Sequence, residues 1–142
     1  MEKGSVSSTS LWSNGLFAIT IYADDLPASR KFYGEMLQMQ EIFANHDSVV
    51  YQMGSACLNV LMKENAPELV APLPIAPSSA GSRSLLTVTV DDVDAAYAAL
   101  VARGMTFLNG PIDRPWGMRT AAFADPSGHC WELAQKINSS AT

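Results

Sequence analysis

The sequence has little cysteine and no long hydrophobic run. Two cysteines in 142 residues are too few for the disulfide framework of a small secreted protein. The first ten residues, MEKGSVSSTS, lack the apolar segment of a secretory signal. No run approaches the roughly 18 apolar residues that a membrane span needs. We therefore expect a cytoplasmic protein without a membrane partner.

Basic residues are also few. The chain has 9 lysines and arginines against 14 aspartates and glutamates, a net charge of −5. A surface that follows nucleic-acid phosphates needs an excess of positive charge, so we expect no nucleic-acid partner. The acidic balance mildly favours cationic ligands. Hydrophobic residues make up 48% of the sequence, which is ordinary for a globular domain.

The first half of the chain predicts a strand, a helix and three further strands. Residues 16–23, LFAITIYA, are rich in β-branched and aromatic types, which favours a buried strand. Asp25 is expected to cap a helix that has Pro27 in its first turn. The apolar face of this helix contains Phe32, Tyr33, Met36 and Leu37. Strands are expected near residues 40–45, 48–53 and 56–62, separated by turns at His46-Asp47 and Gly54-Ser55.

A proline-rich segment then divides the chain nearly in half. Residues 63–83 contain four prolines and are predicted to form an extended linker without a regular helix. A strand is expected over 84–90 and a helix from Val93, with apolar residues at helical spacing as far as Val101. The next strand is predicted to begin at 105–108, followed by a loop, NGPIDRPWG.

The C-terminal stretch RTAAFADPSGHCWELAQ, residues 119–135, predicts a β-hairpin. Asp125, Pro126 and Gly128 occupy the positions that a type I turn prefers. Side chains alternate along a strand, so Glu132 is expected to face away from Trp131.

The two halves are related by an internal repeat. With an offset of 67, ITIYADDLPA aligns with LTVTVDDVDA, and with an offset of 73, CLNVL aligns with CWELA. Each half is thus a βαβββ module, residues 16–62 and 84–136, between terminal tails at 1–15 and 137–142. One helix cannot cover both faces of a four-stranded sheet. The prediction is an α+β fold in which tandem modules form a curved mixed sheet around a cleft, with helices outside.

These patterns resemble the vicinal oxygen chelate superfamily, which includes glyoxalase I, extradiol dioxygenases and bleomycin resistance proteins. The resemblance is carried by DL-x5-FY from Asp25, by DDVDAAY and by DPSGHCWEL, in this order. The segment RPWGMR, residues 114–119, resembles the bleomycin resistance branch. That branch implies a homodimer in which a partner chain completes each ligand cleft.

The resemblance also implies where a metal would be held. Its four ligand positions correspond here to Ala18, Asn59, Leu85 and Glu132, of which only Glu132 is a usual ligand. A catalytic divalent ion needs at least three protein donors. We therefore expect no metal and no other cofactor.

Strand alternation places two sets of side chains in the cleft. One contains Ala18, Thr20 and Tyr22, and the other Leu85, Thr87 and Thr89, while Phe17, Ile19, Ile21, Leu86, Val88 and Val90 should pack under the helices. Within the cleft, the candidate ligand-binding residues fall into three roles. Tyr22 and Trp116 would form stacking walls, Asn59 and Thr87 would form hydrogen bonds, and Glu132 would be the charged anchor.

Each candidate also has a structural interpretation. Tyr22 could be ordinary packing, Arg119 a local salt bridge, and Glu132 a carboxylate that only contacts water. His46 and His129 are predicted at turns, where a histidine is most often a solvated surface residue. Cys57 and Cys130 occupy equivalent strand positions and could line the cleft, and the Asp24-Asp25 and Asp91-Asp92 pairs are better explained as helix caps than as catalytic carboxylates.

The leading hypothesis is a homodimeric protein that sequesters a small cationic or aromatic compound in a metal-free cleft. The alternative is a lyase, isomerase or dioxygenase of the same superfamily with a displaced metal or none. A third possibility is a scaffold whose cleft has lost its ligand. The sequence does not decide whether the protein is an enzyme.

Overall fold

The computed structural model describes residues 11–137 and contains two four-stranded mixed sheets. The strand order is β1-β4-β3-β2 in the first sheet and β5-β8-β7-β6 in the second. Each sheet has one parallel pair, β1 with β4 in the first sheet and β5 with β8 in the second, and two antiparallel pairs. This repetition confirms the predicted α+β fold with tandem βαβββ modules, although the strands form two sheets and not one.

The first module follows the predicted order closely. Its elements are β1 (Ala18–Ala23), α2 (Leu26–Arg30), η1 (Lys31–Met36), β2 (Glu41–Ala44), β3 (Ser48–Met53) and β4 (Ala56–Met62). The second module contains β5 (Leu85–Thr89), α4 (Val93–Ala102), β6 (Asn109–Arg114), β7 (Met118–Ala124) and β8 (Cys130–Lys136). The predicted tails 1–15 and 137–142 lie largely outside the described residues.

The helix of the first module changes character along its length. Asp25 caps α2 by accepting a hydrogen bond from the N–H of Ala28, as predicted. The segment η1 is a π-helix, and the N–H of Leu37 bonds to the carbonyl of Phe32, five residues earlier. The predicted apolar face is confirmed, because Phe32 and Tyr33 are buried in the core.

The predicted loop NGPIDRPWG is mostly a strand. The strand β6 begins at Asn109, four residues after the predicted start, and ends at Arg114. Gly110 has a φ of +85°, and a Cβ atom there would lie 2.3 Å from the carbonyl oxygen of Thr120. The pairing register shifts between Asn109 and Ile112, so a bulge accommodates Pro111, which has no N–H for the ladder.

The proline-rich linker is not fully extended, contrary to the prediction. It contains three short helical segments: η2 (Lys63–Asn65), α3 (Pro67–Val70) and η3 (Ser78–Ala80). Pro67 occupies the first turn of α3, where a missing N–H costs no hydrogen bond. The four prolines of this segment exclude a long helix, but they do not exclude these short helical turns.

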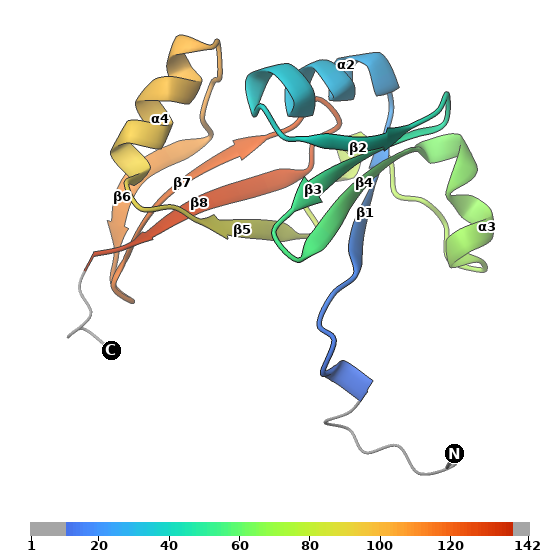
Figure 1. Cartoon of the computed structure of the whole chain (residues 1–142), viewed down its shortest axis with the longest axis horizontal. Helices are drawn as coiled ribbons and strands as arrows, with labels where there is room; N and C mark the ends of the chain where they lie inside the picture. Colours follow the sequence, from blue (N-terminus) through green and yellow to red (C-terminus); the bar gives the residue numbers. More distant parts are fainter. Residues whose placement is uncertain (1–10, 138–142) are drawn as a thin grey trace.

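Helices α2 and α4 lie on the same side of the two sheets, and no helix covers the opposite side in Figure 1. The core between helices and sheets joins both modules, with Tyr33 packed against Trp131 and Phe32 against Phe123. Phe17 is 83% exposed and precedes β1, so its predicted place under the helices was wrong. No helix within residues 11–137 is long and apolar enough to cross a membrane.

Candidate functional site

The helix-free face of the second sheet presents Glu132 at its centre. The register places Glu132 between Thr87 of β5 and Ala122 of β7. Its neighbour Trp131 is 3% exposed on the other face, as the alternation predicted. Leu85, which is 52% exposed, lies two residues before Thr87 on β5 and therefore on the same face. The same face carries Arg114 of β6, whose Nε donates to the hydroxyl of Thr120 at 3.0 Å. It is therefore a weakly polar face with one acid and one arginine that do not form an ion pair with each other.

The carboxylate of Glu132 is held in place by Thr87. The hydroxyl of Thr87 donates a hydrogen bond of 2.9 Å to Oε1 of Glu132. Among the described residues Glu132 forms no ion pair. Burial, and secondarily the charge of Glu132, raises the pKa of the neighbouring Cys130 thiol. An oriented carboxylate without a cation partner can bind a cationic group.

The equivalent pair in the first sheet is neutral. Nδ2 of Asn59 donates to the hydroxyl of Thr20 at 3.3 Å. The side-chain oxygen of Asn59 is buried and has no hydrogen-bond partner in the described part of the chain. A buried acceptor without a donor is costly, so this oxygen is suited to receive a donor from a bound molecule.

The structure does not gather all five predicted ligand-binding residues into one place. It pairs Thr87 with Glu132, while Asn59 lies on the other sheet and Tyr22 lines a separate cavity. Trp116 is 61% exposed in the turn between β6 and β7, beyond the β8 end at Lys136. Four residues of strand separate Lys136 from Glu132, roughly 13 Å at the usual strand rise.

The four family metal positions do not form a donor set. The methyl group of Ala18 and the isobutyl group of Leu85 cannot coordinate a cation. Within residues 11–137, no group of three or more histidine, cysteine, aspartate or glutamate side chains could hold a metal ion. Asn59 and Glu132 alone fall short of the three donors that a catalytic divalent ion requires. These residues do not fit a metal of the family type.

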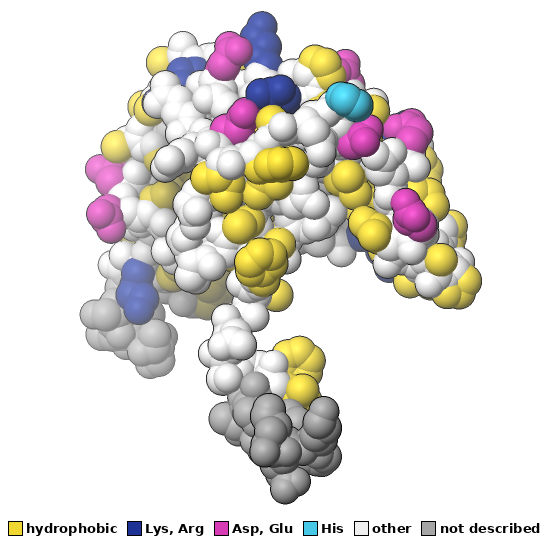
Figure 2. All heavy atoms as spheres, turned by 45° about the vertical axis from the view of Figure 1, so that its right-hand side comes forward, with side chains coloured by type: hydrophobic (Ala, Val, Ile, Leu, Met, Phe, Trp, Pro, Cys, Tyr) yellow, Lys and Arg dark blue, Asp and Glu magenta, His cyan; other side chains and the backbone are white. Residues whose placement is uncertain are grey.

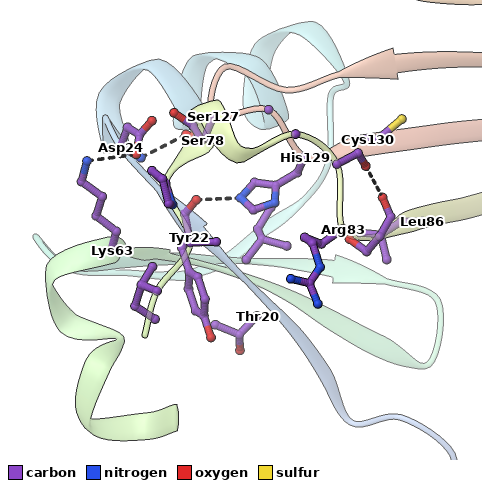
Figure 3. Close-up of a pocket in the computed structure, with 18 of the residues that line it drawn as sticks. Thr20, Tyr22, Asp24, Lys63, Ser78, Arg83, Leu86, Ser127, His129 and Cys130 are labelled. Carbon is purple, nitrogen blue, oxygen red and sulfur yellow. Dashed lines mark hydrogen bonds and ion pairs between the residues drawn. The ribbon is translucent and has the colours of Figure 1, made fainter. Parts of the chain in front are cut away.

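A cavity of about 350 Å³ lies beneath the linker, and the sequence did not predict it. Its walls come from β1, β5, the turn between β7 and β8, and the linker itself (Figure 3). The linker sequence indicates surface chain but not which strands it covers. The proximity of the linker to the β7–β8 turn is shown at Gly128, where a Cβ atom would lie 3.4 Å from the carbonyl oxygen of Ser78.

His129 is not the solvated surface residue that its turn position predicted. Its side chain is half-buried, and Nε2 lies 2.7 Å from the carbonyl oxygen of Tyr22, across the module boundary. Nε2 must carry the proton, because a carbonyl oxygen can only accept. His46 is exposed at its turn, as predicted.

Other charged candidates have local roles. Arg119 forms ion pairs with Asp94 at 3.0 Å and Asp113 at 2.8 Å, which confirms its interpretation as a local salt bridge. In each Asp-Asp pair only the second residue caps its helix, because Asp92 accepts from Ala95 as Asp25 does from Ala28. Both cysteines are free thiols.

These features define a class: paired βαβββ modules with helices on one side and an open sheet face on the other. The profile of the Glyoxalase/Bleomycin resistance protein/Dioxygenase superfamily matches residues 15–133. The chain belongs to this superfamily.

Two solved structures share the fold over most of their length. A glyoxalase/bleomycin resistance protein/dioxygenase from Nocardioides has a TM-score of 0.75 and 25% identity, covering 87% of this chain and 83% of its own. A glyoxalase-related enzyme from Fulvimarina pelagi has a TM-score of 0.71 and 31% identity, covering 84% and 86%.

Curated relatives are more distant or match in part. A Mycobacterium bovis protein is 32% identical over 79 residues, which are 55% of this chain and 52% of the relative. The chain thus spans about half the length of the mycobacterial relatives that it matches. The YraH protein of Bacillus subtilis is 28% identical, covering 86% of this chain and 98% of its own.

Proposed function

We propose that this chain is a cytoplasmic binding protein that sequesters a small cationic or aromatic compound on its open sheet face, without a metal and without breaking a bond. Glu132 anchors the positive charge of the ligand. Thr87 fixes the carboxylate, and the apolar strand residues around it supply contact area. Asn59 and Trp116 are proposed to extend this ligand surface at its margins, whereas Tyr22 lines the separate cavity beneath the linker.

One observation carries this proposal. Glu132 is half-buried, oriented by the 2.9 Å hydrogen bond from Thr87, and unpaired with any cation in residues 11–137. A carboxylate in such surroundings lacks part of its hydration, so a cationic partner gains more there than on an open surface. Its geometry costs no further ordering on binding.

Calorimetric titration with a panel of cationic aromatic antibiotics tests the proposal. Glu132→Gln keeps the shape of the side chain and removes its charge, so the affinity should fall about tenfold, the value of one charge-assisted hydrogen bond. Glu68→Gln, an exposed change on α3, is the matched control and should bind normally. Flat heats across the panel, or equal binding by both variants, would contradict the anchor.

A homodimer is part of the proposal. Leu16 and Phe17 are 68% and 83% exposed ahead of β1, and Phe43 is 53% exposed on β2. Large apolar side chains at such exposure are typical of an interaction surface. Figure 2 shows hydrophobic side chains along the hollowed underside of the molecule. Light scattering after size exclusion should give twice the chain mass, and Phe17→Ser should shift the equilibrium toward monomer.

An enzymatic function is the second candidate, as a lyase, isomerase or dioxygenase of the superfamily. It is favoured by the 31% identity to the protein described as a glyoxalase-related enzyme. Elemental analysis of chain purified without chelators separates the candidates. A stoichiometric divalent ion that is lost in Glu132→Gln would support the enzyme and overturn metal-free sequestration.

A further inference from the structure

The cavity beneath the linker has a defined frame. Its floor contains Tyr22 on β1 and Leu86 on β5, and its roof is the linker from Ile75 to Ser84. His129 at one end is fixed by its 2.7 Å contact with the carbonyl of Tyr22. The main chain of Asp24 donates to the hydroxyl of Ser127 at 3.0 Å, so the β7–β8 turn is fastened to the end of β1. The cavity is therefore framed by three segments: β1, the β7–β8 turn and the linker.

The charge inside the cavity is unbalanced. Lys63 and Asp24 both line it, but they neutralise each other in an ion pair of 3.1 Å. Arg83 also lines it and forms no hydrogen bond or ion pair with any residue that the structure describes. In Figure 3 its guanidinium points toward the side of the cavity where Thr20 and Tyr22 lie. One free positive charge remains.

The rest of the lining is amphiphilic. Apolar side chains come from Ile19, Ile75 and Leu86, and hydroxyl groups come from Ser82 and Ser127. A volume of about 350 Å³ lies at the lower end of the range for small-molecule sites. Such a lining suits a molecule with one flat apolar part and one charged end.

We propose that the linker cavity is a second ligand site, which takes a small aromatic or branched aliphatic compound with a single anionic group paired to Arg83. A guanidinium presents two parallel N–H groups to a carboxylate, a sulfonate or a phosphate. The apolar part of the ligand packs between Ile75 and Leu86. This site differs from the open sheet face, where the anchor is an acid and the ligand a cation.

The test uses 1-naphthoate as the probe and 1-naphthylmethanol as its neutral analogue, titrated into the full chain and followed by amide NMR. Naphthoate should shift the resonances of Gly81, Ser127 and His129, and the alcohol should bind about tenfold more weakly. Arg83→Gln should reduce naphthoate affinity by the same factor, and Arg83→Lys should restore part of it. Lys31→Gln, which changes the net charge equally outside the cavity, should have no effect.

Two outcomes would overturn the proposal: naphthoate binding that is unchanged in Arg83→Gln, or shifts confined to residues outside the cavity. Glu132→Gln separates this site from the open face. It should leave naphthoate affinity unaltered, whereas Arg83→Gln should leave the titration with cationic antibiotics unaltered. Either site can therefore fail without the other.

Discussion

The hydroxyl of Tyr33 donates a hydrogen bond of 2.6 Å to the carboxylate of Asp125, which lies 92 residues later in the chain. The indole N–H of Trp131 donates to the same hydroxyl at 2.9 Å. The other oxygen of Asp125 accepts the main-chain N–H groups of Ser127 and His129. One buried carboxylate thus shapes the β7–β8 turn and joins it to the helix of the first module.

Tyr33→Phe should destabilise the protein by about 1–3 kcal/mol, because Asp125 loses a donor and Trp131 loses an acceptor inside the core. Urea denaturation measures the change. Tyr97→Phe is the matched control, since the Tyr97 hydroxyl forms no hydrogen bond with the described residues, and it should cost much less. Equal losses in the two variants would show that the network adds nothing to ordinary packing.

Stability should fall in alkaline solution. Burial, and then the charge of Asp125, raises the pKa of Tyr33 well above its ordinary value of 10.0. The neutral hydroxyl is therefore favoured by folding, and its contribution is complete below about pH 10 and decreases above it. The free energy of unfolding should drop by up to about 1.4 kcal/mol per pH unit from this group.

The measurement is a series of urea curves from about pH 9 to about pH 11, compared between the wild type and Tyr33→Phe. The difference between the two proteins should shrink as the pH rises, because only the wild type must keep this phenol neutral. A constant difference over the whole range would contradict a network that depends on the proton.

The sequence predicted local features whose cause is local. Asp25 and Asp92 cap helices because a carboxylate three residues before a free N–H reaches it without help from the fold. The turn at Asp125 follows from the turn-forming residues of this segment. The sheet face on which Glu132 lies follows from the alternation of side chains along a strand. Because the two halves of the sequence repeat, these local features also predicted that both modules have the same strand topology.

Features that depend on contacts between modules could not be predicted. His129 bonds to the carbonyl of Tyr22 only because the second hairpin packs against the end of β1. A main-chain carbonyl carries no sequence signal. The linker cavity could not be predicted for the same reason. A high proline content predicts an exposed segment, but it does not indicate which strands Ser78 and Arg83 lie against. The bulge at Gly110 was missed because the glycine and Pro111 indicated a loop.

Glu132 should control the reactivity of Cys130. Burial is the larger cause of the raised thiol pKa and the charge of Glu132 the smaller, so Glu132→Gln should lower that pKa without restoring the ordinary 9.0. In a Cys57→Ser background, iodoacetamide should therefore alkylate Cys130 faster in Glu132→Gln than in its parent at about pH 8.5. Glu68→Gln is the control, and equal rates in all three proteins would contradict the coupling.

Asp24 should hold the linker closed over its cavity. The hydrogen bond from Ser78, and next the ion pair with Lys63, lowers the pKa of the Asp24 carboxyl below its ordinary 3.8. Lys63 begins the linker, so its 3.1 Å ion pair with Asp24 ties that end of the linker to the end of β1, and Ser78, near the other end, acts on the same carboxyl. Asp24→Asn removes the charge and keeps the size. The linker should then open more often, and trypsin should cleave faster after Lys63 and Arg83.

Asp91 provides the matched control, because it occupies the equivalent repeat position in the second module and its side chain has no hydrogen bond or ion pair within residues 11–137. Asp91→Asn should leave cleavage at the linker unchanged, while Asp24→Asn should also weaken 1-naphthoate binding through a less ordered roof.

Because a lowered pKa stabilises only the ionised form, the protection should persist at neutral pH and be lost on acidification below about pH 3.8. Hydrogen exchange of linker amides measures that limit where trypsin is inactive. Equal exchange in the wild type and Asp24→Asn at neutral pH would show that the prolines alone keep the linker in place.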